Sequence, residues 1–306
     1  MNKQICGVLP PIPTPFDANG NVSQEHLRAN LKRWVEAGLH GFVVLGSNGE
    51  YVMLNEKEKI CVWETARAAI PQDRLFIAGT GADSTHETIE LTKHAAQLGA
   101  DAALIVTPHY YRGQMTATAW LHHYRAVADA SPIPILIYNV PVYTTVEIDA
   151  GTVIELAQHE NIVGMKDSSA NFAKMGEIIR FAPAHFSVLV GTGAAIFPAL
   201  SIGAKGVVPA LGNIAPRECV AIYNAFHTAQ TEQARYMQQL SEARNLQLRM
   251  IRPNAAITAK WGVPCLKAAL DEVGYYGGSP RAPLMPLNDS ERTKLREILR
   301  EAELVA

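Results

Sequence analysis

The residue with the most distinctive chemical setting in this sequence is Lys166. It directly follows an apolar run, residues 162–165, and apolar surroundings disfavour the protonated amine and so lower its pKa. A neutral amine can attack a ketone and form a Schiff base. On position alone, a lysine paired with Asp167 at the start of a loop is an equally open interpretation. Most other lysines lie in helical or terminal patterns, where we expect a solvated ammonium group.

A tyrosine ends the preceding apolar run. Tyr138 closes residues 133–138, so if the two runs are neighbouring strands, its phenol lies near the amine of Lys166. A phenol placed there could pass protons during imine formation and C–C cleavage. Considered alone, Tyr138 is more typical of a core tyrosine with a satisfied hydroxyl.

Small hydrogen-bond donors follow the second apolar run. The segment Gly46-Ser47-Asn48-Gly49-Glu50 has two glycines around Ser47 and Asn48. Such a turn presents backbone N–H groups together with short hydroxyl and amide donors, as a carboxylate pocket requires. The pattern alone fits any turn, and we expect Glu50 to anchor the loop.

The elements that must position these residues alternate along the chain. Short apolar runs without polar alternation are typical of strands buried on both faces of a parallel sheet. They cover residues 6–12, 42–45, 75–78, 102–106, 133–138, 162–165, 187–190 and 206–208. Amphipathic helical patterns separate them. The alternation predicts an α/β fold, a (β/α)8 TIM barrel over residues 1–225, with its active site at the carboxyl ends of the strands.

After residue 226 the strand signals stop. Residues 231–250, 254–261, 264–273 and 289–303 all have helical patterns. We therefore expect a C-terminal helical annex, residues 226–306, packed on the barrel.

Composition and charge exclude several classes of protein. The chain has 306 residues, 48% of them hydrophobic and 18% charged, which is unlike a disordered chain. The net charge is −2, without the basic stripe that nucleic acid requires. The chain contains no run of about 18 apolar residues for a membrane span. Its four scattered cysteines indicate reduced thiols in a cytoplasmic protein, and the histidines lack metal-ligand spacing.

Together, the segments Gly46-Ser47-Asn48-Gly49-Glu50, Tyr138-Asn139-Val140-Pro141 and Gly164-Met165-Lys166-Asp167-Ser168 resemble the dihydrodipicolinate synthase/N-acetylneuraminate lyase family. The resemblance covers essentially the whole chain. These proteins are (β/α)8 class I lyases that form a Schiff base with pyruvate. The resemblance implies a small 2-oxo acid as substrate and no dissociable cofactor or metal, because the intermediate is a covalent imine between Lys166 and the substrate.

The resemblance also implies roles for single residues. Lys166 is then the Schiff-base lysine and Tyr138 the proton-relay phenol. Ser47 and Asn48 bind the pyruvyl carboxylate or assist the relay, whereas two further residues, Ser168 and Gly191, line the substrate pocket. Another catalytic candidate, Tyr110, matches a tyrosine that family members insert across a subunit interface, which implies a homo-oligomer, a dimer of dimers.

Within the family, the Ser47-Asn48 pair resembles the 4-hydroxy-2-oxoglutarate aldolase branch, which implies cleavage to pyruvate and glyoxylate. The synthases usually have G-T-T-G-E there. They also place an arginine, which holds the second substrate's carboxylate, where this chain has Tyr143; the aldolases usually have Asn at that position. The alternatives are dihydrodipicolinate synthase, which joins pyruvate to aspartate semialdehyde, an aldolase or dehydratase of 2-oxo-3-deoxy sugar acids, and a non-enzymatic 2-oxo acid sensor.

Overall fold

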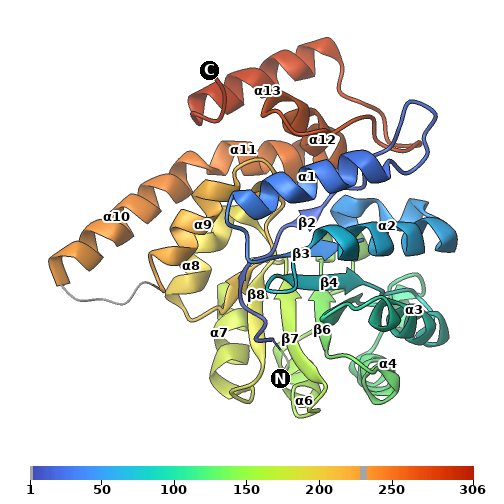
Figure 1. Ribbon diagram of the computed structural model, residues 1–306. Helices are drawn as coiled ribbons and strands as arrows, with labels where there is room; N and C mark the ends of the chain where they lie inside the picture. The colour runs from blue at the N-terminus through green and yellow to red at the C-terminus, as the bar shows by residue number, and fades with distance from the viewer. Residues whose placement is uncertain (1–2, 228–232) are drawn as a thin grey trace.

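The computed structural model describes residues 3–227 and 233–306, and a sheet of parallel strands forms its centre (Figure 1). The strands are β1 Gly7–Val8, β2 Pro11–Ile12, β3 Gly41–Val44, β4 Leu75–Gly79, β5 Ala102–Val106, β6 Ile135–Asn139, β7 Ile162–Asp167, β8 Ser187–Val190 and β9 Gly206–Val207. Their order in the sheet is β1-β9-β8-β7-β6-β5-β4-β3-β2. Since β1 and β2 are two pieces of one short segment, both edges of the sheet meet there and the sheet curls into a barrel.

At least one helix follows each strand from β2 to β9, and the longer helices cover the outer face of the barrel. The helices are α1 Gln24–Glu36, α2 Glu56–Ala69, α3 Thr85–Gln97, α4 Ala117–Ala130, α5 Pro141–Thr144, α6 Ala150–Leu156, α7 Phe172–Phe181, α8 Ile196–Ser201 and α9 Pro216–Asn224. Short 3₁₀ turns are η1 Ser47–Gly49, η2 Tyr51–Met53, η3 Arg112–Gln114, η4 Gly193–Ala195 and η5 Ala210–Asn213. The predicted alternation of parallel strands and helices is confirmed.

Several strand boundaries differ from the sequence prediction by one or two residues, and two of these differences bear on the barrel and the site. The run at residues 6–12 forms two short strands, because the chain changes its partner at Leu9 and Pro10. The Leu9 N–H donates to Val207, whereas Pro10, which has no N–H, only accepts from Val43. The other difference is at Lys166, which lies inside β7 instead of just beyond it.

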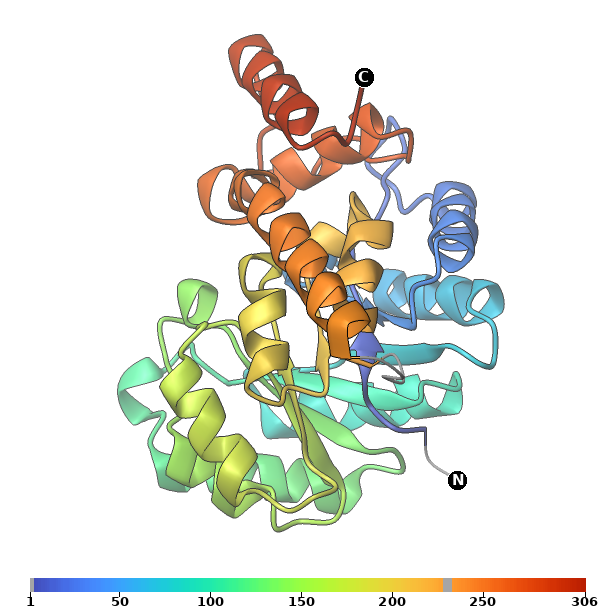
Figure 2. The same cartoon turned by 90° about the vertical axis from the view of Figure 1, so that its left-hand side faces the viewer.

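The C-terminal helices form the annex that the sequence predicts. They are α10 Gln233–Arg249, α11 Ile251–Ala255, the π-helix η6 Ala256–Lys260, α12 Gly262–Glu272 and α13 Asp289–Glu301. Figures 1 and 2 both show the annex on the opposite side of the molecule from α4 and α6. The predicted helix over 254–261 is in fact a short α-helix followed by η6. Thr231, the predicted start of α10, lies outside the described residues, and the division of the chain at 225/226 stays a prediction.

The strands contribute apolar side chains to both of their faces. One cluster fills the barrel interior, with Leu9, Val43, Ile77, Leu104, Leu136 and Leu189 among its members. A larger cluster packs between the sheet and the helices and includes Trp34, Phe42 and Trp63. Burial on both faces explains why the runs lack polar alternation.

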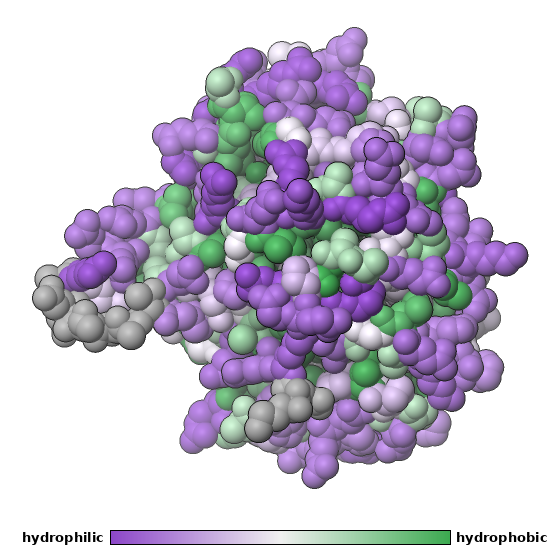
Figure 3. All heavy atoms as spheres, viewed as in Figure 1, coloured by the Kyte–Doolittle hydropathy of each residue, from purple (hydrophilic) through white to green (hydrophobic). Residues whose placement is uncertain are grey.

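The outer surface is mainly hydrophilic on the face shown in Figure 3, where apolar residues form small groups. Within residues 3–227 and 233–306, no helix is long and apolar enough to cross a membrane. The same residues contain no group of three or more His, Cys, Asp or Glu side chains arranged to hold a metal ion.

The close packing of β7 against β8 gives a test of the barrel. A Cβ on Gly164 would lie 2.4 Å from the carbonyl oxygen of Ser187. We therefore expect Gly164→Ala to lower the free energy of unfolding by about 1–3 kcal/mol in urea titrations, because the two strands must move apart. The matched control is Gly176→Ala in α7, where nothing lies within 4 Å of the added Cβ. This control should raise stability by about 0.5–1 kcal/mol; equal effects at the two positions would contradict the tight β7–β8 contact.

Candidate active site

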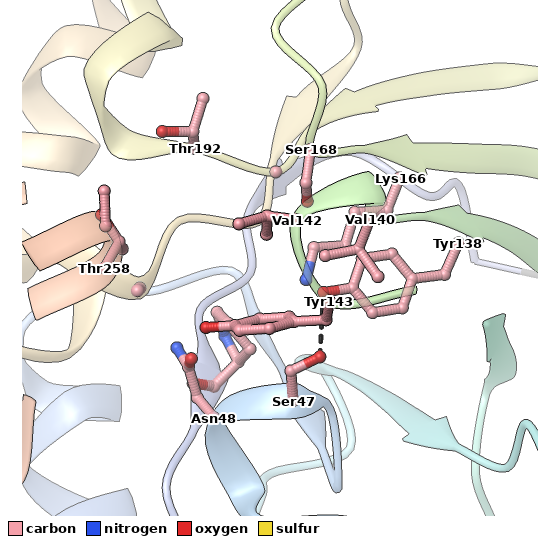
Figure 4. A pocket seen from close by; sticks show the side chains of 14 residues that line it. Ser47, Asn48, Tyr138, Val140, Val142, Tyr143, Lys166, Ser168, Thr192 and Thr258 are labelled. Carbon is pink, nitrogen blue, oxygen red and sulfur yellow. Dashed lines mark hydrogen bonds between the residues drawn. The ribbon is translucent and has the colours of Figure 1, made fainter. Parts of the chain in front are cut away.

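The pairing of β6 with β7 places Tyr138 and Lys166 side by side. The two residues are Cα partners in the parallel ladder, so their side chains point to the same face, into the barrel. The Lys166 Nζ lies 4.0 Å from the centroid of the Tyr138 ring (Figure 4). Lys166 is only 2% exposed, and this burial lowers the pKa of its amine to about 7. A substantial fraction of the amine is therefore neutral near pH 7.

The next residue of β7, Asp167, points to the opposite face of the sheet. Its carboxylate accepts a 2.8 Å hydrogen bond from the Asn139 amide and lies 3.3 Å from the Lys174 Nζ. The structure thus does not support the interpretation that Asp167 pairs with Lys166. It also corrects the expectation of solvated helical lysines, because the Lys174 side chain is 8% exposed.

The turn after β3 presents its donors to the same pair. Its first two residues, Ser47 and Asn48, begin the 3₁₀ turn η1, and the Ser47 hydroxyl is 3.2 Å from the Tyr138 hydroxyl. Burial raises the pKa of Tyr138, while hydrogen bonds from Ser47 and Ser168 partly oppose the shift. Tyr138 therefore stays a protonated phenol linked to a second hydroxyl. Buried Asn48 lines the cavity that surrounds Tyr138 and Lys166.

Ser168 and Gly191 form the wall beside Lys166. The Gly191 N–H donates a 2.7 Å hydrogen bond to the Asp167 carbonyl. A Cβ at Gly191 would lie 2.0 Å from the Ser168 Oγ and 3.1 Å from the Lys166 Cε. A residue larger than glycine would thus displace the lysine or the serine.

These side chains line a cavity of about 340 Å³. Sequence reasoning missed several lining residues, which come from strand ends, loops and the annex: Pro11, Val140, Val142, Thr192, Ala210, Thr258 and Ala259. Thr258 belongs to the π-helix η6, a type of distortion that is frequent at functional sites. No sequence motif marks Thr258, because only the packing of the annex brings it to the barrel.

The charge of the cavity is concentrated at one point. Among the lining residues that the structure describes, Lys166 alone has a cationic side chain. Tyr143, Thr192 and Thr258 contribute hydroxyl groups on the other walls. The arrangement offers one nucleophilic amine, a phenol beside it and neutral donors around them.

Tyr110 does not join this site within the chain. Its side chain is 76% exposed and lies edge-on to Tyr111, with ring centroids 5.0 Å apart. The Asp83 carboxylate accepts the backbone N–H groups of His109 and Tyr110 and so holds this loop. The insertion of Tyr110 across a subunit interface stays a prediction.

Comparisons with known proteins agree with one another on the family. Residues 4–302 match the model of the dihydrodipicolinate synthetase family. A 4-hydroxy-tetrahydrodipicolinate synthase of Methanothrix thermoacetophila is 36% identical over 96% of this chain and 95% of its own. One from Geotalea uraniireducens is 36% identical over 98% of this chain and 99% of its own.

Solved structures support the same conclusion. A dihydrodipicolinate synthase of Bacillus anthracis superposes with a TM-score of 0.90 at 31% identity, over 98% of this chain and 99% of the other. A prophage protein of this family from E. coli K12, solved with pyruvate, has a TM-score of 0.90 at 26% identity, over 99% of this chain and 100% of the other.

The curated relatives above have the synthase name, so the narrower resemblance to the 4-hydroxy-2-oxoglutarate aldolase branch stays a prediction. The family itself rests on nearly the full length of the chain. The chain belongs to the dihydrodipicolinate synthetase family.

Proposed function

We propose that this chain is a class I pyruvate-dependent aldolase whose Schiff base forms at Lys166. The observation that carries the proposal is the buried amine, with a pKa of about 7, next to a phenol that hydrogen-bonds Ser47. A buried titratable group with a perturbed pKa that faces a cavity is a candidate for an active site. The position of Lys166 also fits the Schiff-base chemistry of the family, which supports the same assignment.

In the cleavage direction, Lys166 attacks the C2 ketone of a 4-hydroxy-2-oxo acid, and water leaves to give a protonated imine. The imine accepts the electron pair of the C3–C4 bond as that bond breaks. Tyr138 and Ser47 relay the proton that leaves the C4 hydroxyl, so that an aldehyde is released. The remaining enamine is protonated at C3, and water hydrolyses the imine to pyruvate and free Lys166.

The other lining residues orient the substrate. Ser47 and Asn48 supply hydrogen-bond donors for the pyruvyl carboxylate. Gly191, which has no side chain, leaves the space that the Ser168 hydroxyl fills beside Lys166. Exposed Tyr110 and Tyr111 support assembly into a homo-oligomer, a dimer of dimers, in which Tyr110 reaches a neighbouring subunit.

Two partner aldehydes, glyoxylate and aspartate semialdehyde, can be compared directly. Cleavage of 4-hydroxy-2-oxoglutarate to pyruvate and glyoxylate is supported by the Ser47-Asn48 pair, both of which line the cavity. Condensation of pyruvate with aspartate semialdehyde is supported by the names of the relatives and opposed by Tyr143. Purified protein assayed with each substrate, and with 2-oxo-3-deoxy sugar acids, decides between them; binding of pyruvate without any turnover would favour the sensor alternative.

The Schiff base can be trapped directly. Borohydride reduction in the presence of pyruvate should add one pyruvyl-derived mass to the peptide that contains Lys166, as read by mass spectrometry. Lys166→Met should remove the adduct and the turnover. The matched control is Lys205→Met, outside the cavity, which should leave both intact. An adduct on another lysine, or no adduct at all, would contradict a class I mechanism at Lys166.

The pH dependence of imine formation follows from the lowered pKa. Only the neutral amine attacks the ketone, so the rate should rise as the pH increases through about 7 and level off above it. Tyr138 contributes no inflection there, because burial raises its pKa. The rate of borohydride trapping under limiting pyruvate measures this profile. A rise centred near the usual lysine value of 10.5 would contradict it.

A substitution at Tyr143 tests whether this residue faces the carboxylate of the partner aldehyde. Tyr143→Arg places a cation at the cavity wall, and a charge-assisted hydrogen bond of about 1.5–3 kcal/mol corresponds to roughly 10–100-fold in kcat/KM. We expect a gain of that size for aspartate semialdehyde condensation relative to turnover of uncharged aldehydes. Tyr143→Phe, which removes only the hydroxyl, is the control. Equal changes for charged and uncharged partners would show that residue 143 does not face the second carboxylate.

A further inference from the structure

A buried ion pair joins the annex to the turn that carries Ser47 and Asn48. The Oε1 of Glu50 lies 2.6 Å from the Nζ of Lys267, and their side chains are 1% and 0% exposed. Lys267 belongs to α12 of the annex, so it is a second helical lysine that is not solvated. Its amine also donates to the Ser279 carbonyl at 3.0 Å and lies 4.2 Å from the centroid of the Phe16 ring.

The backbone conformation at Glu50 links this ion pair to the turn that begins at Ser47. Glu50 ends the turn η1 with φ +55°, in the left-handed region, which costs a non-glycine residue roughly 1–2 kcal/mol. Its N–H donates to the Ser47 carbonyl at 3.1 Å. Its carboxylate therefore acts on a turn that begins at Ser47, whose hydroxyl faces Tyr138.

A second contact from the annex fixes the other oxygen of the same carboxylate. The backbone N–H of Arg281 donates to the Glu50 Oε2 at 2.7 Å. The Arg281 guanidinium lies 2.7 and 2.9 Å from the two oxygens of Glu58 in α2. The carboxylate of Glu50 is thus held from two directions, by groups that are themselves anchored.

Stability alone gives a weak reason for this pair. Replacing a buried ion pair by apolar groups of similar shape is often neutral or stabilising, because desolvation of the two charges offsets their attraction. We expect the ion pair, together with the hydrogen bond from the Arg281 N–H, to fix the position of the carboxylate more narrowly than apolar packing would. A one-ångström error in a reacting hydroxyl can cost about a hundredfold in rate.

We propose that Lys267 and Glu50 are positioning residues that hold the Ser47 hydroxyl against Tyr138 for proton transfer. The inference rests on the function proposed above. The proposal gives the annex an indirect part in the reaction, in which Lys267 does not contact the substrate.

The test combines two substitutions that leave no buried charge unpaired. Glu50→Gln with Lys267→Met removes both charges and retains side chains of similar shape. We expect kcat to fall about tenfold per active site, with KM for pyruvate changed less. Pyruvate trapping at Lys166 should stay stoichiometric, because the amine itself is unaltered. Glu301→Gln, which breaks the exposed Arg252–Glu301 pair within the annex, is the control and should leave kcat unchanged.

A double-mutant cycle with Ser47→Ala identifies the route of the effect. If Glu50 and Lys267 act through Ser47, the same paired substitution in the Ser47→Ala background should lower kcat by less than about twofold. An equal fall in both backgrounds overturns the proposal. A lower melting temperature with unchanged kcat per trapped site also overturns it, because the pair is then only structural.

Failure of the paired variant to fold and failure of the protein to trap pyruvate have different meanings. If the paired variant gives no folded protein, Glu50→Asp alone goes through the same cycle, since it keeps a carboxylate opposite Lys267 but shortens the side chain by one methylene. If the unaltered protein itself fails to trap pyruvate, the proposed function fails, and that result is distinct from a kcat that does not respond to the pair.

Discussion

The removal of one amine from water is the constraint on which the remaining architecture depends. Burial beside the Tyr138 ring lowers the pKa of Lys166 to about 7, which is what the proposed nucleophilic role requires. A nearby carboxylate would reverse that effect by favouring the ammonium form. The alternation of β7 prevents this, since it turns Asp167 to the other face, where it pairs with Lys174 and accepts a hydrogen bond from Asn139.

The barrel makes such a site possible because it brings together strand ends that are distant in the sequence. In-register pairing of β6 with β7 sets Tyr138 beside Lys166, and closure through residues 7–12 brings the β3 turn to the same mouth. Tyr138 and Lys166 are therefore placed by a backbone ladder, which is stiffer than a loop, whereas Ser47 lies in the turn that follows β3. The tight Gly191–Ser168 contact shows how little slack remains around the amine.

The sequence predicts the barrel well because strands buried on both faces leave an unambiguous apolar signal, and a lysine that ends such a run is conspicuous. Tyr138 ends such a run and Ser47 follows another, but these patterns alone fit a core tyrosine and an ordinary turn, so their proposed roles depend on the resemblance to the family. Thr258 and Lys267 leave no such signal: both lie in helical patterns, where a hydroxyl or an amine is ordinarily solvated. Their burial depends on how the annex docks, which is a long-range property. The π-helix η6 likewise has no periodicity that distinguishes it from an α-helix.

The docking of the annex has a consequence for the evolution of this protein. Barrels of this kind can acquire new chemistries by exchanging loops and appended segments. Here one appended segment supplies both a wall of the cavity, at Thr258, and the cation opposite Glu50, at Lys267. Recombination that replaced it would alter the candidate site as well as the periphery, so barrel and annex should be inherited as one unit.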